Sequence, residues 1–128
     1  MKIREITENI TQSELSQVEK FADALWHKLG VDIEFSHHFL NRVNNERNEK
    51  PISAAELIRL FKKEYERNGR VISKLHDTEA VMQDVLTSIN LPFVMHDTTA
   101  GNELTAKTVI RKPNFKTTSP IYSIKESS

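Results

Sequence analysis

Two adjacent histidines, His37 and His38, stand in a segment that also carries Arg42. We expect this segment to be helical, and neighbouring helical positions point about 100° apart, so His37 would contribute little to a site built on His38. His38 and Arg42 are one turn apart and would share a face. A histidine can accept and donate protons near neutral pH, and an arginine can hold a phosphate. The pair therefore predicts phosphodiester transfer without a metal. The alternative, which spacing alone favours, is an unrelated pair of surface side chains.

A second candidate site lies near the C-terminus. From Thr99 onward the chain has five basic and two acidic side chains, although the net charge of all 128 residues is zero. We predict that Lys107 and Arg111 project from one side of a strand, where cations and hydroxyls can bind phosphate oxygens. The predicted phosphate-binding residues are Lys107, Thr108, Lys112, Lys116, Thr117 and Tyr122. The alternative is a basic solvated strand face, a common protection of sheet edges.

Several classes of protein are excluded or disfavoured by composition. The chain has no cysteine, which removes disulfides and thiolate metal sites. Its five histidines lack the spacing of a metal site, and three glycines are too few for the common phosphate-binding loops. We therefore expect no metal and no cofactor. No apolar stretch approaches the ~20 residues of a membrane span, and the N-terminal residues lack a secretory core, so we predict a cytoplasmic protein that does not bind membranes.

The N-terminal half has helical periodicity. A first helix is predicted over 11–29, with Thr11 and Glu14 forming a capping box and Gly30 ending it. Its apolar stripe is Leu15, Val18, Ala22, Leu25 and Leu29, flanked by Phe21 and Trp26. Residues 31–35 alternate apolar and acidic side chains, which indicates a short strand.

Two further helices are expected. Ser36 can cap one over 37–47, and the polar run 44–51 is predicted to be a loop outside the core. Ser53 and Glu56 form a second capping box, from which a helix runs to Gly69. Its predicted buried side is Leu57, Ile58, Phe61 and Tyr65, with Glu64 and Glu66 on a solvated face.

The C-terminal half changes to strand-like patterns. Strands are predicted over 80–86, 91–96, 104–111 and 120–125, with a turn over 97–102 whose tight point is Gly101-Asn102. Helices followed by an antiparallel meander define an α+β fold. We predict N-terminal helices packed on an antiparallel sheet of about four strands, in a single domain that covers residues 1–128.

Both candidate sites take part in one resemblance. The order of a helix with Ser36-His37-His38-Phe39-Leu40-Asn41-Arg42, a capped helix, and a strand with Lys107-Thr108 followed by Asn114-Phe115-Lys116-Thr117 resembles the phage-borne branch of the barnase/EndoU/colicin/RelE-like nuclease superfamily. The segment His38 to Arg42 also resembles a stretch of a phage endoribonuclease related to RelE toxins. The match covers roughly Phe35 to Lys125, so residues 1–30 would be an N-terminal helical part and 31–125 the RelE/barnase-like core.

The resemblance implies metal-free RNA cleavage, in which a 2′-hydroxyl attacks the adjacent phosphate. His38 would act as general base or acid, and Arg42 and Arg111 would stabilise charge on the phosphorane. Lys107 and Thr117 would position phosphate. RNA is the implied partner, and the host cytoplasm is the implied location if the protein is phage-encoded.

The chain departs from this pattern at about Lys62, where the related phage nuclease has a second histidine. Two classes of function therefore stay open. One is an active endoribonuclease. The other is an inactive phage accessory or virion-associated protein that uses the same fold to bind a host or phage protein, or a nucleic acid.

Overall fold

The computed structural model describes residues 9–48 and 50–125. Residues 1–8, where we expected no secretory segment, lie outside the described part. The elements in chain order are α2 (Gln12–Trp26), the 3₁₀ helix η1 (His27–Leu29), β1 (Val31–Phe35), α3 (Phe39–Val43), the 3₁₀ helix η2 (Glu46–Asn48), α4 (Ala54–Ile72), β2 (Thr78–Asp84), β3 (Ile89–Thr98), β4 (Gly101–Ala106), β5 (Ile110–Arg111) and β6 (Ile121–Ile124). In these described ranges, no helix combines the length and apolar content needed to cross a membrane.

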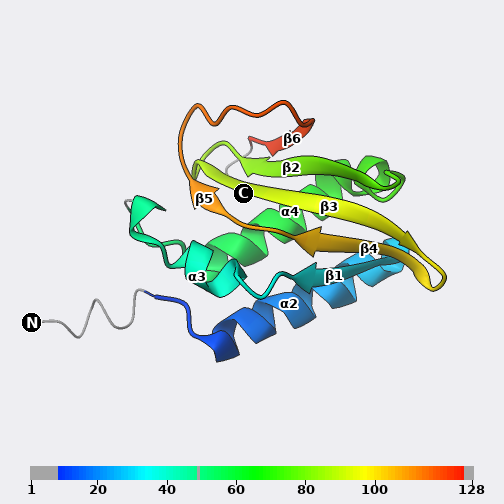
Figure 1. Cartoon of the computed structure of the whole chain (residues 1–128), viewed down its shortest axis with the longest axis horizontal. Coiled ribbons are helices and arrows are strands. Elements are labelled where there is room, and N and C mark those ends of the chain that lie inside the picture. Colours follow the sequence, from blue (N-terminus) through cyan, green and yellow to red (C-terminus); the bar gives the residue numbers. More distant parts are fainter. Residues whose placement is uncertain (1–8, 49, 126–128) are drawn as a thin grey trace, which may run out of the picture.

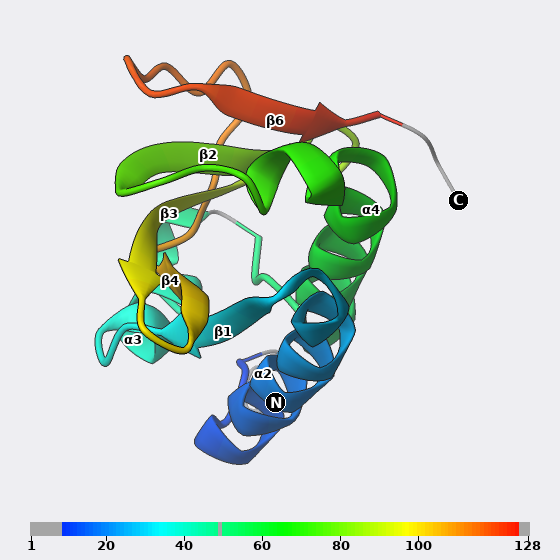
Figure 2. The ribbon, with the colours of Figure 1, turned by 90° about the vertical axis from the view of Figure 1, so that its right-hand side faces the viewer.

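The molecule has two layers. Figures 1 and 2 show α2 and α4 together on one face of the sheet, and no helix covers the middle of the other face. The strand order is β1-β4-β3-β2-β6, with β5 beside β3. The α+β prediction is confirmed, but the predicted set of about four antiparallel strands is wrong. Six strands form a mixed sheet, because β1 runs parallel to β4 and β6 runs parallel to β2.

Helix α2 begins as the sequence predicts. The Thr11 side chain accepts from the Glu14 backbone N–H, and the Glu14 side chain accepts from that of Thr11. The buried side differs from the predicted stripe, since Leu25 and Leu29 are only partly buried and Trp26, expected at its flank, is fully buried, whereas Phe21 is 37% exposed. The Trp26 indole N–H donates to the Phe61 carbonyl oxygen at 3.2 Å and so ties α2 to α4.

Helix α4 also begins at its predicted cap, Ser53, but it continues past Gly69 to Ile72. A Cβ at Gly69 would lie 2.9 Å from Cδ1 of Leu29. This glycine therefore permits a close approach of Leu29 to the helix, at the position where the sequence predicted a helix end.

Glu64, predicted to be solvated, has no exposed surface. Its carboxylate accepts from the Gln83 backbone N–H at 3.2 Å, which joins α4 to β2.

The β1 edge of the sheet is covered by α2. Asp23 accepts the backbone N–H of Ile33 at 2.8 Å, and Glu19 accepts that of Phe35 at 3.1 Å. These side chains satisfy donors that would otherwise be open to a further strand. The acidic residues of α2 therefore have a structural use.

Strands β3 and β4 form the predicted antiparallel hairpin, in which Met95 pairs with Leu104. The turn falls at residues 99–100, and Gly101 and Asn102, expected at its tight point, instead begin β4. Gly101 has a φ of 131°, and a Cβ there would lie 3.1 Å from the carbonyl oxygen of Gly30. Glycine is therefore needed at this position by both backbone conformation and space.

The strand predicted over 104–111 is interrupted. β4 ends at Ala106, and β5 then pairs with the start of β3. Lys107 lies near Glu79 of β2, whereas Arg111 pairs opposite the fully buried Ile89. The prediction that Lys107 and Arg111 project from one side is wrong, because the irregular residues 107–109 shift the alternation.

Candidate functional site

Ser36, which precedes α3, forms two hydrogen bonds to the backbone at the end of β4. Its backbone N–H donates to the Ala106 carbonyl oxygen at 3.0 Å, and its hydroxyl donates to that of Lys107 at 2.8 Å. The hydroxyl is therefore not the predicted helix cap, and α3 has five residues with His38 at its N-cap. The exposed His37 follows directly, so these hydrogen bonds hold both imidazole-bearing residues next to the Lys107 segment.

The two imidazoles are in contact. Their ring centroids lie 4.1 Å apart, with 43° between the ring planes. We expected rings directed about 100° apart. That expectation is wrong because both residues precede the α-helix, so helical spacing does not apply to them. The Arg42 backbone N–H donates to the His38 carbonyl oxygen at 3.1 Å, which keeps these residues one turn apart, and both side chains are exposed.

Lys107, the residue that follows β4, carries a predicted phosphate-binding cation. Its Nζ lies 3.6 Å from a carboxylate oxygen of Glu79, and the two side chains are 45% and 60% exposed. An ion pair this exposed is weak, so Lys107 can exchange its partner for another anion at small cost.

Arg111 is held much more firmly. Its side chain is 10% exposed, and its Nη2 donates to Glu56 at 2.7 Å. Three more of its five N–H donors reach the carbonyl oxygens of Lys50, Pro51 and Thr87, at 3.1, 2.8 and 2.8 Å. These contacts tie β5 to the segment before α4. The guanidinium would have to give up native hydrogen bonds before it could bind a phosphate.

The pKa of Glu56 reflects this environment. Burial acts to raise it, but hydrogen bonds from Arg111 and Ser53 and the arginine charge outweigh burial, so the Glu56 pKa is lowered. Asn48, predicted to lie in a solvated loop, belongs to the same structure and is 1% exposed. It accepts the Arg111 backbone N–H at 2.9 Å and donates to the Val43 carbonyl oxygen at 3.0 Å.

The remaining predicted site residues do not gather at one point. Thr108 has a buried hydroxyl without a hydrogen-bond partner among the described residues. Lys116 and Thr117 are exposed in the connection from β5 to β6, whereas Tyr122 is partly buried against the core. Lys112 is exposed and lines a cavity of about 280 Å³.

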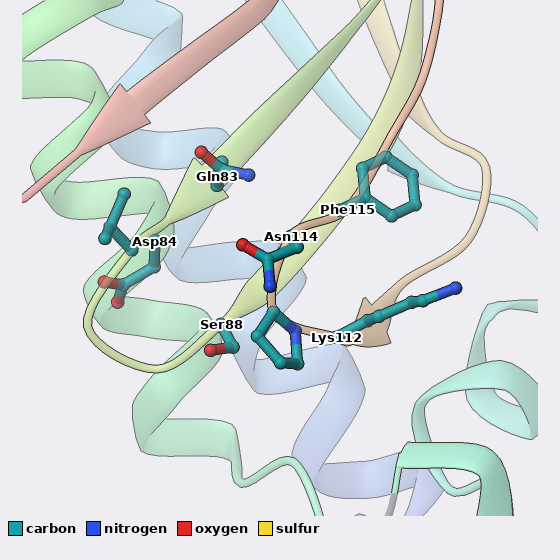
Figure 3. A pocket seen from close by; sticks show the side chains of 8 residues that line it. Gln83, Asp84, Ser88, Lys112, Asn114 and Phe115 are labelled. Carbon is teal, nitrogen blue, oxygen red and sulfur yellow. The ribbon is translucent and has the colours of Figure 1, made fainter.

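The cavities near these residues are separate. His37 lines one of about 250 Å³ between α2 and the start of α3. Arg111 and Glu56 line another of about 380 Å³. The cavity at Lys112 lies between residues 112–115 and the β2–β3 connection, and Figure 3 shows Gln83, Asn114 and Phe115 around it. Gln83 could not be selected from the sequence, because an isolated amide carries no spacing signal, and Asn114 entered only as part of the motif that precedes Lys116 and Thr117.

Acidic side chains lie at the β1 edge of the sheet, whereas this cavity lies near β2, toward the β6 edge. Partial burial, followed by repulsion from Glu19 and Glu103, raises the pKa of Glu34 in β1. These carboxylates therefore disfavour a phosphate directly beside Glu34. Within the described ranges, no three acidic or histidine side chains gather closely enough to hold a metal ion.

The fold and these residues define an α+β domain with an imidazole pair at one end of a mixed sheet. No protein-family model matches the chain, and no curated protein or solved structure matches it either.

Proposed function

We propose that the protein is a metal-independent endoribonuclease of the phage type. The observation that supports this most strongly is the contact between the His37 and His38 rings, in a segment that Ser36 joins to the backbone of Lys107. RNA cleavage by its own 2′-hydroxyl needs a base, an acid and cations near the phosphate. The two imidazoles and Arg42 stand in one short segment, and Lys107 adjoins it through its backbone carbonyl, while its Nζ lies 3.6 Å from Glu79.

In this proposal, neutral His38 accepts the 2′-hydroxyl proton as the 2′-oxygen bonds to phosphorus. The bond from phosphorus to the 5′-oxygen breaks, and protonated His37 donates to that leaving oxygen. The products are a 2′,3′-cyclic phosphate and a 5′-hydroxyl. His37 thereby takes the place of the second histidine that the resemblance leads one to expect at about Lys62.

The cations have different parts in this proposal. Arg42 and Lys107 are exposed, and they neutralise charge on the phosphorane. Arg111 was predicted to do the same, but its donors are bound to Glu56 and to backbone carbonyls. We assign it a positioning role, in which it holds the start of the Lys112 segment.

The test is cleavage of total cellular RNA in the presence of a chelator, with the cut ends mapped. His38→Ala and His37→Ala should each lose ~10²–10⁴ of the rate, since each removes one proton-transfer group. The exposed His27 serves as the matched control, and His27→Ala should cut at the wild-type rate. Thermal unfolding followed by circular dichroism checks that all variants fold.

Wild-type protein that leaves RNA intact, or equal effects of His27→Ala and His38→Ala, would contradict the proposal. The second candidate, a non-catalytic phage accessory protein with a protein or nucleic-acid partner, would then be preferred. Its protein-binding form is favoured by the engagement of Arg111 with Glu56 and by the carboxylates around Glu34. Neither feature helps to bind a polyanion.

A further inference from the structure

Gln83 lines the cavity beside residues 112–115, and a series of hydrogen bonds fixes the orientation of its side chain. The series begins at Asn90, which has no exposed surface. Its Nδ2 lies 3.1, 3.2 and 3.0 Å from the carbonyl oxygens of Ser88, Ile110 and Lys112. Carbonyl oxygens only accept hydrogen bonds, so the Asn90 amide cannot be turned round. Its Oδ1 must therefore face Gln83.

Gln83 is oriented in turn. Its Nε2 donates to Asn90 Oδ1 at 2.9 Å, and its Oε1 accepts from the Ser123 hydroxyl at 2.8 Å. A glutamine amide has two donor hydrogens and two acceptor positions. These contacts use one of each, which leaves one N–H and one acceptor position on Gln83. Gln83 lines the cavity, and Figure 3 shows its amide nitrogen directed toward Asn114 and Phe115.

The opposite wall comes from the connection between β5 and β6. The Lys112 backbone N–H donates to the Ser88 carbonyl oxygen at 2.7 Å, which fastens the connection to the β2–β3 turn. Asn114 has a φ of 57°, a left-handed conformation that asparagine tolerates. Its side-chain amide is exposed at the edge of the cavity. The half-buried ring of Phe115 borders the same space (Figure 3).

We infer that this cavity binds one nucleobase of single-stranded RNA. The aromatic face of Phe115 stacks on the base, the amides of Gln83 and Asn114 pair with its edge, and Lys112 meets the adjoining phosphate. Single-stranded RNA is typically recognised in this way, by aromatic stacking and hydrogen bonds to base edges. The volume of about 280 Å³ is sufficient for one base and lies at the small end of ligand pockets. The inference rests on the proposed function, because RNA is the substrate proposed there, and this site would bind a part of the strand away from His37 and His38.

The experiment measures binding separately from cleavage. The probes are four fluorescein-labelled hexanucleotides of 2′-O-methyl A, C, G or U, whose blocked 2′-oxygen prevents cutting. Fluorescence anisotropy should show that wild type prefers one of the four. Phe115→Leu should weaken binding of that probe by roughly 5- to 150-fold, the effect of losing one stacked base. Asn114→Gly, which keeps the left-handed backbone, should reduce the preference by about threefold to tenfold.

The matched control is Phe21→Leu, since Phe21 is an exposed aromatic residue on the helical layer. It should bind all probes like wild type. Phe115→Leu that binds like wild type, or no binding of any hexanucleotide, overturns the base site. Free mononucleotides that compete as tightly as the hexanucleotides overturn its assignment to RNA. Cleavage that is unaffected by Phe115→Leu refutes this site alone, whereas Phe115-dependent binding without any cleavage refutes the ribonuclease alone.

Discussion

At the level of single residues, polar side chains between elements do much of the work of positioning the candidate site. Arg111 is an example, because its guanidinium bridges Glu56 at the start of α4 and three backbone carbonyls. A buried guanidinium without its carboxylate would be strongly unfavourable. The Glu56–Arg111 pair is therefore the polar contact whose loss we expect to be most costly in this region.

The pair predicts a difference between two similar capping boxes. Glu56→Gln should lower the free energy of unfolding by about 1–3 kcal/mol near pH 7, because it removes a charged hydrogen-bond partner from Arg111. Glu14→Gln is the matched control, since Glu14 completes the same box in α2 with no arginine attached. It should cost less than about 1 kcal/mol. Urea denaturation of the variants and wild type measures both values.

The same pair gives the stability a pH dependence of known sign. The Glu56 pKa is lowered in the folded state, so the unfolded chain binds the proton more readily. The stabilisation is complete above the unfolded pKa and is lost as the pH falls through the folded pKa. The difference between wild type and Glu56→Gln should therefore shrink between about pH 5 and pH 3. A difference that stays constant over this range would show that Glu56 does not act through its charge.

Residues of this kind also limit what the sequence could predict. Glu64 and Asn48 are buried although their sequence neighbourhoods are polar, because each satisfies backbone groups of a distant element. Gln83 likewise gains its fixed orientation from Asn90 and Ser123. No periodicity marks such contacts. His38 and Arg42 were predicted as site residues from their spacing, and both are exposed. His37 was predicted to point away from them, although its ring contacts that of His38.

At the level of elements, local signals were reliable where the cause was local. Both capping boxes form as predicted, and the alternating residues 31–35 form β1. The short α3 was misjudged because Ser36 bonds to Lys107 rather than to its own helix. One strand was predicted where the structure has β4 and β5, because their residues form one alternating run. The two strands pair with different parts of β3, which the alternation does not reveal.

Helix α2 provides a test of its observed orientation. Leu15 is 4% exposed, and Leu15→Ala should lower the free energy of unfolding by about 2–5 kcal/mol. Phe21→Ala removes a larger side chain that is 37% exposed, and it should cost clearly less. Trp26 is the single tryptophan and is buried between α2 and α4, so its fluorescence reports unfolding. Equal losses in the two variants would mean that the helix is rotated from this orientation.

At the level of the whole molecule, the mixed sheet is the feature that sequence could least predict. A hairpin such as β3–β4 has a turn between its strands, whereas the parallel pairs β1–β4 and β2–β6 join distant segments with no local marker. Antiparallel neighbours were therefore assumed throughout. The strands themselves, their approximate positions and the α+β class were all accessible from pattern.

The sheet order predicts an uneven pattern of hydrogen exchange. Strand β3 has a partner on both sides, and Leu91, Phe93 and Met95 have no exposed surface. Its amides should open only with global unfolding and exchange most slowly. Strand β6 is an edge, and its amides should exchange faster through local opening. Exchange followed by NMR tests this order, and equally slow exchange in β6 would show that the edge and centre open as one unit.

The pairing of β1 with β4 has a consequence for the nascent chain. Val31 aligns with Asn102, so β1 leaves the ribosome long before its strand partner is synthesised. Helix α2 is made first, and its Asp23 and Glu19 bind the outer amides of β1. The inner side of β1 meanwhile has no strand to pair with. That interval is when the chain is most open to pairing with another copy, and the helix leaves only one of the two sides of β1 available for it.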